Sequence, residues 1–177
     1  MQVEVCIQNQ INQSSKDKLT NLNLYPAVIY PQTWKNWFKT WLKYLQPHIP
    51  PAPSYELGVL LTSDKEIQFL NANYRFQNKP TDVLAFATLE VKCPKSEDML
   101  NSMPLSLGDI IISVETAQRQ AQNQEHLLLT ELAWLATHGL LHLLGWDHHD
   151  EYTLQIMFHQ QVALLNKVGI TIDFDPL

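Results

Sequence analysis

Three histidines in the run THGLLHLLGWDH constrain this chain more than any other feature of its sequence. His138 and His142 are four residues apart, and His148 follows six residues later. Helix positions i and i+4 lie on one face about one turn apart, so the first two imidazoles can converge. Gly145 can take the left-handed conformation that ends a helix. The pattern predicts a metal-ligand helix, a glycine turn and a third ligand that folds back.

The number and type of these ligands predict the kind of metal site. Three imidazoles without a fourth protein ligand are typical of a catalytic zinc with a bound water, whereas structural zinc usually has four ligands rich in cysteine. The chain has two cysteines, Cys6 and Cys93, and both are far from the histidines in sequence. Nitrogen ligands suit zinc, copper, nickel and iron, and cellular availability favours one Zn²⁺ ion. The alternative is a chance cluster of helix-surface histidines.

The residue after the first histidine bears on the reaction. The spacing HxxxHxxGxxH is also that of the metzincin proteases, which carry a glutamate at that position as general base. Here the position is Gly139. Without the carboxylate, the group that removes a proton from metal-bound water is missing. A zincin-type metallopeptidase stays open as an alternative, but it requires a different base.

Three blocks lie in order along most of the chain, between about residues 55 and 165. They are LNANYRFQNKPTDVLAF (70–86), LGDIIIS (107–113) and HGLLHLLGWDH (138–148). They resemble the LNxxYRxxxxPTDVLSFP, LGDIxIS and HGxLHLxGYDH motifs of the YbeY family, the bacterial single-strand endoribonucleases of ribosomal RNA maturation. The sequence departs from these motifs at Ala85 for serine, Ala87 for proline and Trp146 for tyrosine. None of the departures removes a metal ligand.

The resemblance implies both a fold and a function. The fold is a zincin-like α+β domain with a roughly four-stranded mixed sheet and about five helices. The function is a metal-dependent endoribonuclease that processes the 3′ end of 16S rRNA and acts in ribosome quality control. Its expected partners are single-stranded rRNA and the small ribosomal subunit or its associated proteins, without DNA or membrane. A noncatalytic ribosome-assembly factor stabilised by its metal is the second open alternative.

One arginine is the candidate catalytic side chain. Arg75 is one of only two arginines and is predicted in a loop that ends at Pro80. Attack on a phosphodiester builds negative charge on nonbridging oxygens, and a guanidinium is well matched to two such oxygens. The resemblance aligns Arg75 with the family's functionally implicated arginine; on its own, a loop arginine can equally be a surface residue. Whether metal-activated water or the RNA's own 2′-hydroxyl attacks stays open.

Several other side chains are candidates for supporting the ligands. Asp82 and Asp147 can each orient a ligating imidazole through its second nitrogen, or serve as a strand-edge cap and a turn residue. Glu131 lies seven residues before His138, on nearly the same helical face. Three further residues are expected to be structural: Met157 in the core rather than beneath the metal, and His126 and His149 in solvent. The alternative for His149 is a contact with a ligand residue or with substrate.

Hydrophobic patterns predict the remaining elements. Strands are expected near 1–9, 55–61, 82–88 and 107–113, and helices near 33–46, 63–73, 114–123, 127–144 and 152–168. Ser63 with Glu66 forms a capping box, and Asp150 can cap the last helix. The aromatic stripe of 33–46 favours core packing over RNA stacking, and its lysine row favours a solvated face over a phosphate track. Segments 9–30 and 89–106 are predicted to be a variable insertion and a surface loop.

Composition bounds the cellular setting. At 177 residues, 1–177 is expected to be one domain without disulfide scaffold, leader or membrane span, in the cytoplasm. The net charge is −6, which argues against tight nonspecific binding of RNA. Residues 1–120 carry 11 basic and 11 acidic side chains, whereas 121–177 carry Lys167 against seven acids. The acidic excess therefore lies in the third of the chain that bears the histidines.

Overall fold

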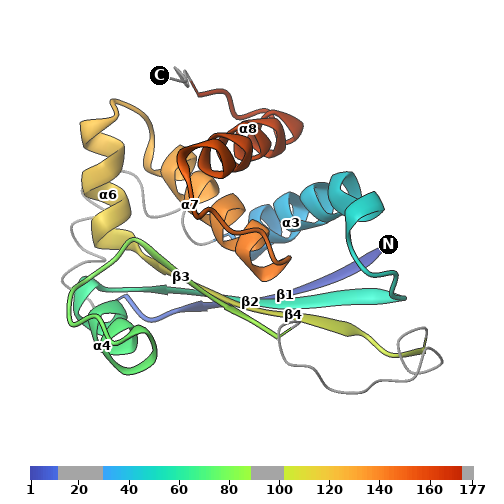
Figure 1. Ribbon diagram of the computed structural model, residues 1–177, viewed down its shortest axis with the longest axis horizontal. Coiled ribbons are helices and arrows are strands. Elements are labelled where there is room, and N and C mark those ends of the chain that lie inside the picture. Colours follow the sequence, from blue (N-terminus) through green and yellow to red (C-terminus); the bar gives the residue numbers. More distant parts are fainter. Residues whose placement is uncertain (12–29, 89–101, 173–177) are drawn as a thin grey trace.

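The computed structural model describes residues 1–11, 30–88 and 102–172, and in them one four-stranded sheet carries helices on both faces (Figure 1). Helices α3, α6, α7 and α8 lie on one side of the sheet, and α4 lies on the other. The elements in order are β1 (Gln2–Asn9), α3 (Pro31–Leu45), the 3₁₀ turn η1 (Gln46–His48), β2 (Ser54–Thr62), α4 (Asp64–Arg75), β3 (Val83–Ala87), β4 (Leu105–Ser113), α6 (Val114–Asn123), α7 (Leu128–Leu143) and α8 (Glu151–Lys167). The predicted α+β class with a mixed sheet is confirmed.

The strand order places β4 inside the sheet and β3 at an edge. The order is β1-β2-β4-β3, with β1, β2 and β4 parallel and β3 antiparallel to β4. Ile110 and Ile112 of β4 belong to the main core, whereas Ile111 packs in a smaller cluster with Ile67 and Leu84 under α4. The run 110–112 is therefore buried on both faces of the sheet, as is usual for an inner strand with helices on both sides.

The aromatic stripe of α3 is part of the core. Trp34, Trp37, Phe38 and Trp41 are at most 6% exposed, and their rings contact one another with centroids 5.2–6.3 Å apart. The Trp41 indole Nε1–H donates a hydrogen bond of 2.9 Å to the carbonyl of Leu164 in α8. These buried rings cannot stack on RNA bases, so the prediction of core packing is confirmed.

The predicted helix caps are present in part. Ser63 Oγ accepts the backbone N–H of Glu66, which is one half of the predicted capping box. At α8, Asp150 accepts the backbone N–H of Thr153, and Thr153 Oγ1 in turn accepts the backbone N–H of Asp150. Each cap satisfies backbone donors that the first helical turn leaves without partners.

The end of α4 differs from the prediction. The helix was expected to stop near Asn73 with Arg75 in the following loop, but Arg75 is its last residue. No glycine marks the stop. Phe76 itself takes the left-handed conformation, with φ of 58°, and its backbone N–H donates to the carbonyl of Asn71. Sequence patterns place helix ends by glycine and proline, so this end is displaced by two residues.

Two predicted loops lie mostly outside the described residues. Of segment 9–30, the structure describes only the two ends, with Asn9 in β1 and Tyr30 as the N-cap of α3. Of segment 89–106, residues 102–106 are described, and Leu105 and Ser106 belong to β4 rather than to a loop. That residues 1–177 form one domain stays a prediction.

Helix α7 packs closely against the sheet at Gly139. A Cβ atom built on Gly139 would lie 2.7 Å from Cγ2 and 3.1 Å from Cγ1 of Ile110, which is fully buried in β4. Real Cβ atoms essentially never come this close to another side chain. The helix can therefore occupy this place only because residue 139 has no side chain.

This contact predicts the effect of Gly139→Ala. Overpacking costs about 1–3 kcal/mol, and alanine regains ~1 kcal/mol of helix propensity, so the free energy of unfolding should fall by as much as ~2 kcal/mol. Denaturant unfolding of Gly139→Ala, Ile110→Ala and the double variant checks this. Because Ile110→Ala removes the clashing methyl group, the double variant should lose less than the sum of the two single changes. Additive losses in the double variant would contradict the contact.

Candidate metal centre

The three histidines come together because α7 ends in a glycine turn. His138 and His142 lie on α7, and Gly145 follows its C-cap with φ of +85°. The backbone N–H of Gly145 donates to the carbonyl of His142, and that of Trp146 to Leu141, each at 3.0 Å. These bonds close the last helical turn and redirect the chain. The predicted turn that returns His148 to the first two ligands is present.

The ring nitrogens converge on a common point. One nitrogen from each of His138, His142 and His148 lies within 4.8 Å of the others, and the three ring centroids are 4.6–5.8 Å apart. The Nε2 atoms of His138 and His142 are 3.1 Å apart. Two nitrogens of a tetrahedral zinc site are about 3.3 Å apart, since each Zn–N bond is ~2.0–2.1 Å. This donor set can hold one metal ion.

A buried glutamine that sequence reasoning missed orients the first ligand. Gln161 of α8 is fully buried, and its Oε1 lies 3.2 Å from Nδ1 of His138. Its Nε2 donates to the carbonyl of Trp134 at 3.2 Å, which fixes which way the amide faces. An acceptor at Nδ1 keeps the proton there and leaves the Nε2 lone pair for a metal. The available signal was a glutamine on the apolar face of α8, four residues after Met157.

Burial prepares the ligands to bind a cation. Desolvation lowers the pKa of His138, and the hydrogen bond between His138 and Gln161 opposes this by raising it. Desolvation, with the charges of the other two rings, lowers the pKa of His142 to about 4. Both imidazoles are therefore neutral at pH 7, which is the form that donates a lone pair to a metal.

The two aspartates lie near the rings but bond to other groups. Asp82 accepts hydrogen bonds from the backbone N–H of Val83 and from the Gln120 side chain, at 2.8 and 3.0 Å. Asp147 accepts the backbone N–H of His148 at 2.8 Å. Their charges raise the pKa of His138 and His142 respectively, each as a secondary effect. Direct orientation of a ligand ring by either aspartate stays a prediction.

The remaining candidate residues near the histidine motif have other partners or lie in the core. Glu131 is buried and bonds to His126, so His126 is not the solvated residue that was expected. Burial raises the pKa of Glu131, the His126 hydrogen bond opposes this, and the charge of Asp82 adds to it. His149 is exposed as expected, and its Nε2 lies 3.1 Å from Asp147. Met157 is 1% exposed in the main core.

Arg75 shares one cleft with two of the ligands. The cleft holds about 480 Å³, and Arg75, Gln77 and Asp82 line it together with His138 and His142. The Arg75 guanidinium donates through Nη2 to the carbonyl of Ala85 at 2.9 Å, and its Cζ lies 6.0 Å from the Phe86 ring centroid. Because β3 is an edge strand, an arginine on α4 can reach past it toward α7.

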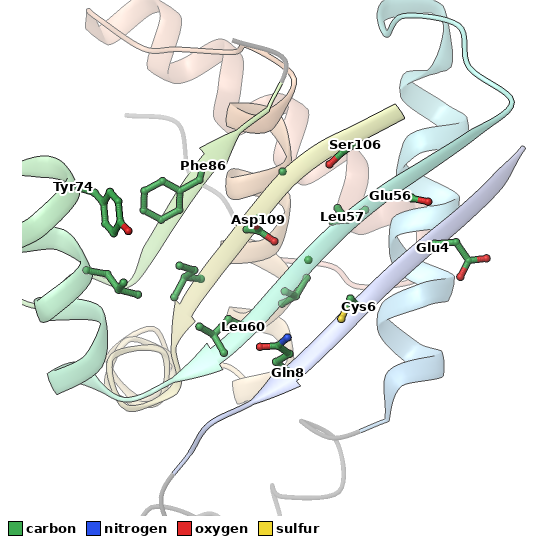
Figure 2. A pocket seen from close by; sticks show the side chains of 15 residues that line it. Glu4, Cys6, Gln8, Glu56, Leu57, Leu60, Tyr74, Phe86, Ser106 and Asp109 are labelled. Atoms are coloured by element: carbon green, nitrogen blue, oxygen red, sulfur yellow. The ribbon is translucent and has the colours of Figure 1, made fainter. Parts of the chain in front are cut away.

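A larger hollow of about 660 Å³ lies on the face of the sheet that α4 flanks (Figure 2). Glu4, Glu56 and Asp109 line it from three neighbouring strands, and Tyr74 and Phe86 stand at its rim (Figure 2). Carboxylates repel phosphate, and none of the three ligand histidines lines this hollow. The smaller cleft beside the histidines is therefore the candidate site.

Sequence comparisons relate the chain to known proteins. The family model described as endoribonuclease YbeY matches residues 19–169. The chain belongs to this family. It is 54% identical to the endoribonuclease YbeY of Nostoc sp. over 98% of this chain and 94% of that one. It is 53% identical to that of Trichormus variabilis over 99% of both chains, and 53% identical to that of Trichodesmium erythraeum over 96% and 94%.

A solved structure supports the fold. The solution structure of TM1509 from Thermotoga maritima superposes with a TM-score of 0.52 and 22% identity, over 94% of this chain and 88% of that one. Among the described residues, no helix combines the length and the apolar composition that a membrane span requires.

The contact of Gln161 with His138 predicts a loss of metal affinity in Gln161→Leu. Removing a partner of a ligating imidazole typically costs about 10–100-fold in metal affinity. Zn²⁺ affinity should be measured by competition with a chelator, beside Gln155→Leu, whose amide bonds to Glu151 instead. Equal affinity in wild type and Gln161→Leu would remove Gln161 from the site.

The depressed pKa values predict a pH dependence of stability for the metal-free protein. The unfolded chain takes up a proton on His142 near pH 6.5, whereas the folded chain resists this until about pH 4. The free energy of unfolding should therefore fall as pH drops from 6.5 to 4. Chemical denaturation with chelator present measures this, and His142→Gln should show a shallower fall. An identical pH dependence of the two proteins would contradict the shift.

Proposed function

We propose that this protein is a metal-dependent endoribonuclease that cleaves single-stranded ribosomal RNA. The observation that carries the proposal is the shared cleft, which Arg75 lines together with two of the imidazoles that can hold a metal. A phosphodiester needs these two kinds of group, because its nonbridging oxygens gain negative charge during hydrolysis. Membership of the endoribonuclease family supports the same substrate class.

The ligand residues define what the cleft can hold. His138, His142 and His148 would bind one Zn²⁺ ion, a choice that their nitrogen donors and cellular availability favour. When bound, such an ion supplies an electrophile and lowers the pKa of water from ~15.7 toward ~7. Gln161 keeps His138 in the tautomer that can bind. Burial of His138 and His142 keeps the site ready at neutral pH.

Arg75 is the proposed phosphate-binding residue. One of its N–H groups is used by the Ala85 carbonyl, and a guanidinium has five, so several donors stay available to a phosphodiester. The Ala85 bond and the Phe86 ring hold the side chain at the cleft. A lysine would keep the charge but lose the planar fork that binds two oxygens together.

Packing disfavours the peptidase alternative. A metzincin glutamate would have to stand at Gly139, where even a Cβ atom would lie 2.7 Å from Ile110. The proposed role is therefore RNA cleavage in maturation of the 3′ end of 16S rRNA and in ribosome quality control, with the small ribosomal subunit or its associated proteins as partners. That substrate implies a cytoplasmic protein.

Cleavage assays on matched variants test this function. Wild type, His142→Ala, Arg75→Lys and Arg75→Ala would be purified identically, analysed for metal and incubated with single-stranded RNA. His142→Ala should lose metal and cleavage together. Arg75→Ala should retain metal but lose roughly 100-fold or more in rate, as when a transition-state donor is removed, with Arg75→Lys impaired.

Arg119→Lys is the matched control. The second arginine bonds to Asp64 and Thr116, outside the cleft, so its replacement should leave cleavage unchanged. Equal cleavage by all variants would indicate a contaminating nuclease and refute the proposal. Hydrolysis of an unstructured polypeptide instead of RNA would favour the peptidase. A lower melting temperature of His142→Ala without any cleavage by wild type would favour a noncatalytic assembly factor.

A further inference from the structure

Phe76, directly after Arg75, is held in an unfavourable conformation without being buried. Its φ of 58° lies in the left-handed region that favours glycine, and its side chain is 92% exposed. A non-glycine residue in this region costs on the order of 1 kcal/mol, and an exposed ring gains almost nothing from burial in return. Neither chain folding nor core packing accounts for phenylalanine at this position.

The position of Phe76 connects it to the candidate cleft. Both of its chain neighbours, Arg75 and Gln77, line that cleft, so the backbone of Phe76 lies beside it and its exposed ring is next to the cleft in the chain. Two hydrogen bonds fix the turn, because the backbone N–H groups of Phe76 and Gln77 both donate to the carbonyl of Asn71. A buried Asn71, whose Nδ2 also donates to the carbonyl of Lys79, braces the whole turn.

The charge around this turn differs from that of the rest of the chain. Residues 67–81 contain Arg75 and Lys79 and no aspartate or glutamate, in a protein with a net charge of −6. Both basic residues are exposed. An exposed ring between cationic side chains is the arrangement that binds single-stranded nucleic acid, where bases stack and phosphates pair with cations.

Neighbouring aromatic residues differ in availability. Tyr74 already packs edge-on against Phe86, with centroids 5.3 Å apart, at the rim of the acidic hollow (Figure 2). Phe69 is 61% exposed and lies within α4, six residues before the helix ends at Arg75. Phe76 is more exposed than Tyr74 and Phe69, and it directly follows Arg75.

We propose that Phe76 stacks on an unpaired base of the RNA whose phosphate Arg75 binds, and so helps to select single strands. The inference rests on the proposed function. A duplex keeps its bases stacked on one another, so their faces are unavailable to a protein ring; only an unpaired nucleotide can offer both a free face and a nearby phosphate.

Binding of short oligonucleotides tests this inference separately from cleavage. A fluorescent single-stranded 2′-O-methyl RNA oligonucleotide, checked for integrity afterwards, would be titrated with the zinc-loaded wild type, Phe76→Gly, Phe76→Asn and Phe76→Trp. Glycine and asparagine both tolerate the left-handed conformation, so these variants should melt at or above the wild-type temperature. They should bind about fivefold or more weakly, the size expected from loss of one stacked base, while Phe76→Trp retains affinity.

An abasic scan identifies the partner of the ring. Removal of the base that stacks on Phe76 should lower the affinity of wild type as much as the Phe76→Gly substitution does. The same removal should not lower the affinity of the Phe76→Gly protein further. Affinity of Phe76→Gly within twofold of wild type would overturn the inference. So would an equal loss for duplex RNA or for every abasic position. If wild type binds in this manner but cleaves no RNA, the proposed function fails while the stacking role stands.

Discussion

The approach of α7 to β4 at Gly139 is the contact on which the candidate site depends. Ile110 is buried beneath it, and a Cβ at residue 139 would collide with its methyl groups. The missing side chain lets the helix lie close to the sheet, which brings His138 and His142 beside edge strand β3 and the arginine that reaches around it. The same contact excludes the carboxylate that would supply peptidase chemistry. One packing constraint thus bears on both ligand position and the type of reaction.

Burial gives this cleft its chemical character. Desolvation keeps the imidazoles of His138 and His142 neutral, whereas the Arg75 side chain is exposed to solvent. Gln161 is neutral and buried, so it can hold an imidazole without the desolvation cost that an aspartate would pay there. Asp82 and Asp147 instead satisfy backbone N–H groups at the start of β3 and in the glycine turn.

Much of the fold could be predicted because its determinants are local. The i, i+4 histidines, the glycine turn and the Asp150 cap each depend on residues a few positions apart. The end of α4 was missed because Phe76 closes the helix where a glycine would be expected. The role of Gln161 was missed because it depends on how α8 packs against α7. The pairing of His126 with Glu131 was missed because it depends on how the loop before α7 folds back onto that helix. Gln161 lies 23 residues from His138 in the sequence, so no local pattern connects the two.

The carboxylates are distributed unevenly around the proposed path of the strand: Asp82 and Asp147 line the candidate cleft, whereas three others lie on a different face. Glu4, Glu56 and Asp109 gather on the sheet face flanked by α4, and the candidate cleft lies across β3 from them. Successive residues of a strand point to opposite faces, so Phe86 lines the acidic hollow while Ala85, beside it, lines the cleft. Arg75 contacts both residues at this boundary. A phosphate chain attracted by the acid-free turn and repelled by the acidic face would follow the edge of β3, which leads past Arg75 to the histidines. Net charge alone cannot exclude such binding, because the local distribution of charge is what steers a polyanion.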